Sequence, residues 1–294
     1  MIASHEFGGQ HTELKLSVVE GYLKAFTQAL RAQFQELWYI DAFAGTGSRT
    51  VRTIEEGGGL FEQPIIEVVE IRRGSAQIAL EVKPTFDRVV FMESRASYCT
   101  ELEALKARYP DRDISIIRGD ANHAIQSQIK WPGWNKTRAV MFLDPYGMEV
   151  EWKTLQAVAA TRAIDVWFLF PLAGLYRQAT RRLTDIDEHK RAALTRMFGS
   201  DRWEEELYPT LQKTDLFGQF KDERRRLANV TGLETYVKKR LETIFPKVLK
   251  PLALPINTKP QRFSLFLCIS NPEPRAIGLA TRIGNHILKA GMSS

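Results

Sequence analysis

Near its start the chain contains a stretch whose apolar residues recur at helical spacing. Between positions 12 and 34 these residues are Leu14, Leu16, Val18, Val19, Tyr22, Leu23, Phe26 and Leu30. A repeat of three to four residues places such side chains on one face of a helix. The pattern predicts an N-terminal helix over 12–34, with Thr12 as its N-cap.

Five short apolar runs follow, each too short for a helix and rich in residues that favour strands. They cover residues 36–43, 88–93, 113–120, 138–145 and 163–171. Helix-like segments such as 97–109 and 151–162 separate several of them. Strands that are apolar throughout and alternate with helices form a parallel sheet covered on both faces. In such sheets ligands bind beyond the carboxyl ends of the strands.

The pattern changes after the fifth run. Residues 172–235 contain no clear strand and are predicted to form a charged helical insertion after the fifth strand. A helix over 233–245, two last strands over 248–257 and 262–270, and a final helix from about 274 to 290 complete the prediction. We therefore expect one α/β domain, 1–294, with a Rossmann-like, seven-stranded, mostly parallel sheet and helices on both faces.

Composition narrows the class of protein. With 294 residues, 44% of them hydrophobic and 26% charged, the chain can bury a large core without disulfides or structural metals. Its two cysteines lie far apart and its five histidines lack zinc-ligand spacing, so we expect no disulfide framework and no metal. No apolar run approaches the ~20 residues that span a bilayer, and the first 15 residues do not resemble a secretion signal. We therefore expect a cytoplasmic protein without membrane contact.

Charge is uneven along the chain. The net charge is +6, yet the C-terminal part, 236–294, holds ten Lys and Arg residues against only Glu242 and Glu273. A basic lobe of this kind attracts the phosphates of nucleic acids, although a merely solvated basic face is the simpler alternative.

Four of the five apolar runs carry an acid at or near the carboxyl end. These acids are Asp41, Glu93, Asp120 and Asp144. They are either solvated strand ends or the lining of one shared pocket at the edge of the sheet. A row of acids suits a cationic cofactor better than a pyrophosphate, because like charges repel. In such a pocket Glu93 would accept hydrogen bonds from ribose hydroxyls, Asp120 would face an adenine amino group, and Asp41 would face a cationic amino-acid moiety.

A glycine-containing loop follows the first strand in "YIDAFAGTGSRT", residues 39–50. Gly45 and Gly47 can adopt positive φ and let a ligand approach the backbone closely. The loop is neither a P-loop nor a GxGxxG motif, so a plain turn is the alternative. Its neighbours Phe43 and Ala44, with Ser94 after Glu93 and Ala121 after Asp120, complete the predicted cofactor contacts.

These motifs resemble those of class I S-adenosylmethionine-dependent methyltransferases. "DAFAGTGSRT" is similar to the FAGSG loop of amino-methylating enzymes that act on nucleic acids, and "FLDPYG" (142–147) resembles their D/N-P-P-Y/F motif without the second proline. More specifically, residues 10–170 resemble the three-Cys-motif partner proteins, a bacterial methyltransferase-like family. The resemblance implies the Rossmann-like class I methyltransferase fold, S-adenosylmethionine as cofactor and a possible companion protein.

On this resemblance Asp144, Pro145 and Tyr146 are the predicted catalytic residues. The Asp144 carboxylate and the Pro145 carbonyl would accept hydrogen bonds from an exocyclic amine, direct its lone pair at the methyl group and stabilise the growing positive charge. Tyr146 would stack on a flipped-out base, with Gly147 leaving room for it. The alternatives are that Tyr146 is a packed turn aromatic and that Asp144 contacts only the cofactor.

Several weaker candidates remain. Glu93 lies further beyond the glycine loop than the ~20 residues usual for a ribose-binding acid, so we interpret "EEGGGLFEQP" (55–64) as a loop and "RRGSAQIAL" (72–80) as the start of a displaced helix, capped by Ser75. His123 would contact the cofactor or begin a surface helix. His11 and Lys15 would close the pocket.

Two further segments admit two interpretations each. The basic cluster "DERRRLA" (222–228) would hold phosphates or form a solvated helix face, the second being preferred. "KWPGWNK" (130–136), with Trp131 and Trp134, would form a base-stacking rim or, preferably, a packed loop.

The sequence therefore predicts a methyltransferase that N-methylates a base in RNA or DNA. Methylation of a small molecule or a protein is one alternative. A non-catalytic, defence-associated partner protein that keeps the cofactor pocket is another.

Overall fold

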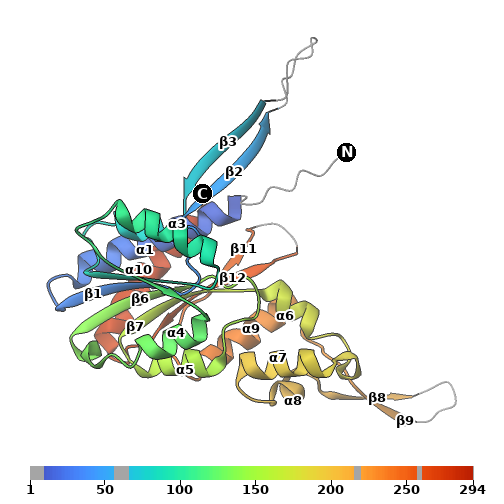
Figure 1. The fold of residues 1–294 in the computed structure, drawn as a ribbon. Coiled ribbons are helices and arrows are strands. Elements are labelled where there is room, and N and C mark those ends of the chain that lie inside the picture. The colour runs from blue at the N-terminus through green and yellow to red at the C-terminus, as the bar shows by residue number, and fades with distance from the viewer. Residues whose placement is uncertain (1–9, 56–65, 215–219, 257–259, 294) are drawn as a thin grey trace.

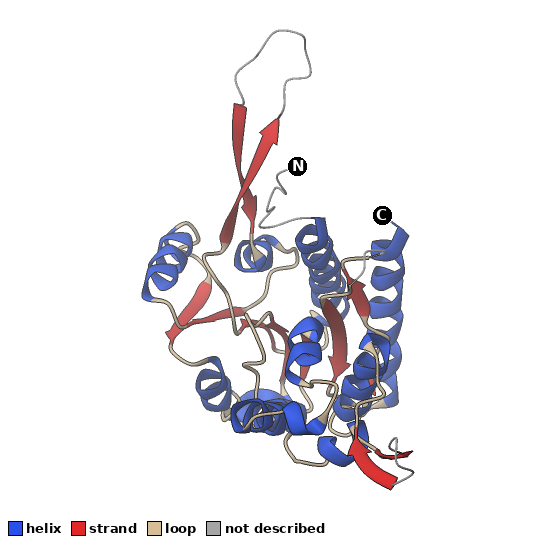
Figure 2. Cartoon of the chain, turned by 90° about the vertical axis from the view of Figure 1, so that its right-hand side faces the viewer, coloured by secondary structure: helices blue, strands red, loops and turns tan. Residues whose placement is uncertain are grey.

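A computed structural model describes residues 10–55, 66–214, 220–256 and 260–293 (Figure 1). A central sheet is covered by helices on both sides (Figure 2), as the apolar strands predicted. None of the helices within the described ranges has an apolar stretch long enough to span a membrane.

Five strands of the sheet are parallel and correspond to the five predicted runs. Along the sheet they lie in the order β5, β4, β1, β6, β7. Their bounds are β1 Glu36–Asp41, β4 Arg88–Glu93, β5 Asp113–Arg118, β6 Thr137–Leu143 and β7 Ile164–Phe170. Because all five run the same way, their carboxyl ends meet at one edge.

An antiparallel edge completes the sheet beside β7. Strand β12 (Phe263–Ile269) pairs antiparallel with β7. The predicted strand 248–257 is in fact two short strands, β10 (Lys247–Val248) and β11 (Leu252–Leu254), which pair with opposite ends of β12. The sheet is thus seven positions wide, as predicted, but contains eight strands.

Alternate strand residues face two separate cores. In β1, Leu37 and Tyr39 pack into one core, while Trp38 and Ile40 pack into the other. The first core contains α1 (Gln10–Leu30), α2 (Ser75–Glu81), α3 (Ala96–Ala107) and α10 (Pro274–Ser293). The second contains α4 (Ala121–Gln128), α5 (Trp152–Ala160), the short η1 helix (Pro132–Asn135) and the insertion that follows β7.

The first helix differs from its predicted bounds. Helix α1 begins by Gln10 and ends at Leu30, so Thr12 lies inside the helix and is not its cap. The last predicted residues, 31–34, form the turn into β1.

The insertion after β7 is not purely helical, which corrects the prediction for 172–235. Its helices are α6 (Leu172–Gln178), η2 (Leu183–Asp185), α7 (Glu188–Phe198), α8 (Trp203–Leu207) and α9 (Val230–Leu241). Between α8 and α9 lies an antiparallel hairpin of β8 (Thr210–Thr214) and β9 (Phe220–Arg224). The sequences TLQKT and FKDER lack an apolar run, so the pattern gave no strand signal.

The basic cluster 222–228 lies on β9 and the segment after it rather than on a helix face, and two of its arginines are engaged within the insertion. Arg224 donates to the carbonyl oxygens of Tyr208 (3.3 Å) and Glu204 (2.6 Å). Arg226 is buried and donates from Nε to the carbonyl of Ala179 at 2.8 Å. These guanidinium groups fasten segments of the insertion to one another.

A second hairpin that the sequence did not predict leaves the glycine loop. Strands β2 (Ser48–Glu55) and β3 (Ile66–Arg73) pair antiparallel and extend away from the rest of the molecule (Figure 1). The predicted loop 55–64 lies almost wholly outside the described residues. The displaced helix is confirmed as α2, but Gly74 occupies its N-cap without a side-chain cap, so Ser75 is not the cap.

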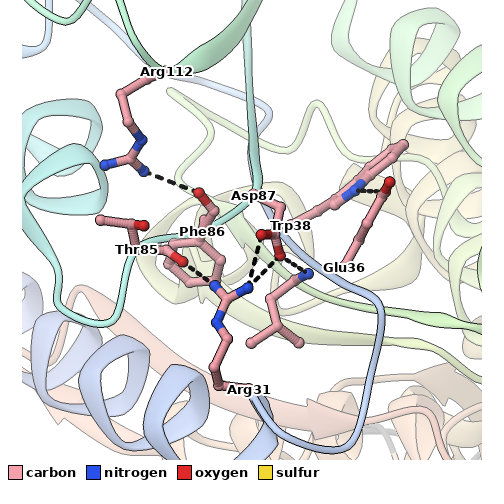
Figure 3. Close-up of polar contacts among 8 residues, drawn as sticks. Arg31, Glu36, Trp38, Thr85, Phe86, Asp87 and Arg112 are labelled. Atoms are coloured by element: carbon pink, nitrogen blue, oxygen red, sulfur yellow. Dashed lines mark hydrogen bonds and ion pairs between the residues drawn. The ribbon is translucent and has the colours of Figure 1, made fainter.

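At the amino ends of the strands, polar contacts fasten the turn between α1 and β1 (Figure 3). Nη1 of Arg31 donates to both carboxylate oxygens of Asp87, at 2.7 and 2.6 Å. Asp87 also accepts the Leu37 backbone N–H at 2.6 Å, and Arg112 donates to the Phe86 carbonyl at 3.1 Å.

We expect Asp87→Ala to lower the free energy of unfolding by about 1–3 kcal/mol, because the Leu37 N–H loses its carboxylate acceptor and Arg31 loses its charge partner. Urea unfolding measures the change. In the control Asp113→Ala, the lost side chain is 57% exposed and lies 3.7 Å from Arg88, so a change within about 0.5 kcal/mol is expected. Equal losses in both variants would contradict this account.

Candidate cofactor pocket and active site

The four predicted acids lie along one edge of the sheet. Asp41 and Glu93 are the last residues of β1 and β4, Asp144 follows β6, and Asp120 follows β5 after a single glycine. Since β1 lies between β4 and β6, Glu93 and Asp144 flank Asp41. The prediction that the strand order gathers these residues is therefore confirmed, whereas their ligand contacts remain a prediction.

A pocket of about 400 Å³ opens at this edge, above β4 and β5. Six of its lining residues were predicted: Phe43, Glu93, Ser94, Asp120, Ala121 and Tyr146. Five others were not: Ala42, Arg95, Gly119, Asn122 and Glu149. The other predicted residues, Asp41, Ala44, Gly45, Gly47, Asp144 and Pro145, are not among its lining residues.

The glycine loop needs both of its glycines. Gly45 and Gly47 have φ values of +62° and +77°, a region that disfavours other residues. A Cβ on Gly47 would also lie 2.7 Å from a methyl carbon of Leu105. The loop therefore approaches α3 as closely as a backbone without a side chain allows, and a role in ligand binding remains a prediction.

The carboxylate of Glu93 is held in place from three sides. Oε2 accepts the Gly45 N–H at 3.1 Å, while Oε1 accepts the Arg95 N–H at 2.8 Å and the Ser94 hydroxyl at 3.4 Å. Glu93 is buried except for the side that lines the pocket. An oriented, nearly dry carboxylate of this kind is suited to binding a pair of hydroxyl groups.

Asp41 lies underneath the loop and is fully buried. Its carboxylate accepts the Tyr39 hydroxyl at 3.1 Å and the Phe43 N–H at 3.3 Å. Burial raises the pKa of Asp41 to about 6, a hydrogen bond from Ser75 opposes the shift, and the charge of Asp144 adds to it. Because Asp41 is fully buried, a ligand cannot contact it directly in this structure, contrary to the prediction. Its charge would act on a ligand only from beneath the glycine loop.

Asp144 is paired with a residue from the first helix. Nζ of Lys15 forms an ion pair with Oδ2 of Asp144, and the same ammonium lies 5.8 Å from the ring centroid of Phe142. Lys15 is buried, while the Asp144 side chain keeps 28% exposure. Lys15 therefore reaches the turn after β6 but is not among the residues that line the pocket, so its predicted role in closing the pocket remains a prediction. The side chain of His11 lies outside the described residues.

Tyr146 is not a packed turn aromatic, because it is 64% exposed. The Arg95 guanidinium lies 4.8 Å from the Tyr146 ring centroid and 5.0 Å from that of Tyr98, whose hydroxyl it also contacts at 3.0 Å. A Cβ on Gly147 would meet nothing within 4 Å, so the space beside Tyr146 is open as predicted. Arg95 follows β4 and Tyr146 follows β6, and β1 lies between these two strands. The contact between Arg95 and Tyr146 therefore crosses the carboxyl end of β1.

The far wall of the pocket is built on the start of α4. Asp120 is the N-cap of this helix and accepts the His123 N–H at 2.9 Å, so one of its oxygens is already engaged. Asn122 donates to the Glu149 carbonyl at 2.9 Å and accepts the Glu151 N–H at 3.0 Å, which ties the loop after β6 to α4. His123 is exposed and lies outside the lining, as the surface-helix alternative predicted.

Trp131 and Trp134 are remote from this edge. Their rings lie 4.4 and 5.3 Å from Trp38, near the amino end of β1, and Trp134 donates to the Ile129 carbonyl at 2.9 Å. The packed-loop alternative is therefore correct.

Sequence reasoning missed Arg95, Asn122 and Glu149. Arg95 and Asn122 each stand two residues after a predicted acid, at the start of the following helix. The signal was available, because helix starts after parallel strands border the ligand edge of such sheets. Glu149 had no comparable signal, since only folding of the loop after β6 brings it to the pocket. Within the described residues, no three His, Cys, Asp or Glu side chains cluster as metal ligands.

Comparison with solved structures gives matches at low sequence identity. Protein LPL1258 from Legionella pneumophila matches with 12% identity and a TM-score of 0.49, covering 94% of this chain and 92% of its own. An S-adenosylmethionine-dependent methyltransferase from Clostridium acetobutylicum (11%, TM-score 0.33) covers 85% and 91%, and the N-terminal domain of EvdMO1 with SAH (10%, TM-score 0.37) covers 84% and 80%. No family model and no curated protein matches the sequence.

The strand order identifies the class of fold. Five parallel strands ordered β5, β4, β1, β6, β7, followed by the antiparallel β12, form a Rossmann-like class I methyltransferase fold. This assignment rests on the topology of the chain itself, and it confirms the predicted fold class.

We expect Asp41→Asn to change the pH dependence of stability. The folded-state pKa of about 6 exceeds the unfolded value of about 4, so the folded protein binds this proton more tightly and loses stability as the pH rises between those values. Relative to wild type, the variant should gain about 2 kcal/mol between pH 4 and pH 7 in urea unfolding. The exposed Asp113→Asn is the control. Parallel profiles for wild type and Asp41→Asn would refute a raised pKa.

Proposed function

We propose that this protein is an S-adenosylmethionine-dependent methyltransferase that N-methylates a base in RNA or DNA. The observation that carries the proposal is the turn of Asp144, Pro145 and Tyr146, which follows β6 and places a partly exposed carboxylate beside an exposed aromatic ring. Tyr146 of this turn lines the same pocket as Glu93 and Asp120.

The pocket residues fit the methyl donor. Glu93 would accept hydrogen bonds from ribose hydroxyls, and the free oxygen of Asp120 would accept one from the adenine amino group. Phe43 and Ala44 with Gly45 and Gly47 offer a backbone that a ligand can approach, while Ser94 and Ala121 complete the wall. When bound, the donor supplies a methyl group activated by a positively charged sulfur. The acidic edge favours that charge.

Asp144 and Pro145 would act on the acceptor. Oδ2 of Asp144 is engaged by Lys15, which fixes the carboxylate and leaves Oδ1 to accept an N–H from an exocyclic amine. A second N–H would bond to the Pro145 carbonyl. Together the two acceptors orient the lone pair and stabilise positive charge as it develops on nitrogen.

Tyr146 and Arg95 support a nucleic-acid substrate. Arg95 covers one face of the Tyr146 ring, so a base would stack on the other face, next to a positive charge suited to a phosphate. Two basic residues of the C-terminal part are engaged within the protein. Lys238 is paired with Glu242, and Arg240 packs on Trp152 with its ring centroid at 4.8 Å. The resemblance to three-Cys-motif partner proteins and the companion protein it implies remain predictions.

We expect Asp144→Asn to lower methyl transfer by about 100-fold or more, because the acceptor for the amine loses its charge. The assay follows tritiated methyl from S-adenosylmethionine into total RNA, DNA and protein. Asp113→Asn, far from the pocket, serves as the control for general damage. Label that enters only protein, or that is indifferent to Asp144→Asn, would contradict the proposed reaction.

We expect Tyr146→Ala to raise the KM for the nucleic acid about 5- to 100-fold while leaving donor affinity nearly unchanged, since one base–aromatic stack is lost. Tyr176→Ala is a matched control. Tyr176 is also an exposed tyrosine, 42% exposed, covered by an arginine (Arg226, 4.6 Å), but it lies in the insertion. Equal effects on donor and substrate binding, or equal effects of the two variants, would argue against stacking.

A further inference from the structure

Lys15 brings a fixed positive charge to the acidic edge. Its Nζ pairs with Oδ2 of Asp144 and lies 5.8 Å from the Phe142 ring centroid, and the residue as a whole is only 8% exposed. The charge therefore acts in a largely dry environment, where electrostatic interactions are stronger and less screened by salt than at the surface.

The helix that carries Lys15 is anchored independently. Two turns further along α1, the Tyr22 hydroxyl donates to Oδ2 of Asp165 at 2.8 Å, at the amino end of β7. Val18, Val19 and Leu23 of the same helix are buried in the core. Lys24 offers a contrast on this helix, since its side chain is 56% exposed and it forms a surface ion pair with Glu20 at 2.8 Å. Lys15 is thus a held charge rather than a mobile surface lysine.

The Lys15 ammonium offsets the repulsion between the carboxylates of Asp41 and Asp144. The charge of Asp144 raises the pKa of the buried Asp41, which shows that the two carboxylates interact. Lys15 offsets this repulsion when no other cation is present. Any further cation that approaches the same carboxylates meets the Lys15 charge as well.

We propose that Lys15 is a specificity-determining residue for the methyl donor: its charge lowers the affinity of the site for the cationic donor relative to the demethylated product, which carries no charge on sulfur. The inference rests on the proposed function only for the identity of the two ligands. The same ammonium that fixes Asp144 for catalysis thus opposes the donor's sulfonium.

The test is calorimetric binding of S-adenosylmethionine and S-adenosylhomocysteine to the full chain, which needs no methyl acceptor. In Lys15→Gln, which can still donate a hydrogen bond to Asp144, the donor should gain about tenfold in affinity relative to the product. Lys15→Arg keeps the charge and should keep the wild-type ratio. Lys24→Met, the matched control on the same helix, should also leave the ratio within about twofold.

Other outcomes overturn the inference in distinguishable ways. An unchanged ratio in Lys15→Gln, or equal weakening of both ligands, would mean that Lys15 is only a structural clamp, while the proposed function stands. Binding of neither ligand to the wild-type protein would refute the donor itself and with it both proposals. If Lys15→Gln does not fold, Lys15→Met at the same position gives the same readout with the same expected ratio.

Discussion

The structure depends on the compensation of carboxylates that parallel strands force together. Strands β4, β1 and β6 end side by side, so acids at their carboxyl ends cannot avoid one another. Asp41 and Glu93 are buried, and leaving them unpaired would cost several kcal/mol each. Each acid instead has its own partners: Tyr39 and the Phe43 N–H for Asp41, Gly45 and Arg95 N–H groups for Glu93, the start of α4 for Asp120, and Lys15 for Asp144. The hydrogen bonds and the ion pair to these carboxylates therefore help to position the glycine loop, α1 and α4.

The parts of the fold that the sequence predicted are those that bury apolar strands on both faces. The five parallel strands read as continuous apolar runs because each contacts a core on either side. Hairpin β8–β9 escaped prediction because its two five-residue strands, TLQKT and FKDER, leave little apolar pattern. Hairpin β2–β3 was also missed, although its strands are eight residues long and β3 contains Ile66, Val68, Val69 and Ile71. Pro251, which lacks an N–H, stands between β10 and β11, and this explains why one predicted strand became two.

The candidate site likewise has a part that the sequence predicted and a part that it did not. Strand ends and the glycine loop follow from local sequence, so the acids, Gly45 and Gly47 were identifiable. The contacts that complete the site join segments that are distant in sequence. Lys15 reaches Asp144 from the first helix, and Arg95 meets Tyr146 across the end of β1. Such pairs depend on how helices pack on the finished sheet, which no local pattern encodes.

The base of the β2–β3 hairpin has a consequence for how this protein can diversify. The chain leaves the glycine loop and returns to it at adjoining points, where the Gly74 N–H donates to the Gly47 carbonyl at 2.9 Å. That closure separates the loop from β2 and β3, which extend outward (Figure 2). The segment is therefore an exchangeable module: it can lengthen, shorten or change sequence during evolution while the geometry next to the pocket stays the same.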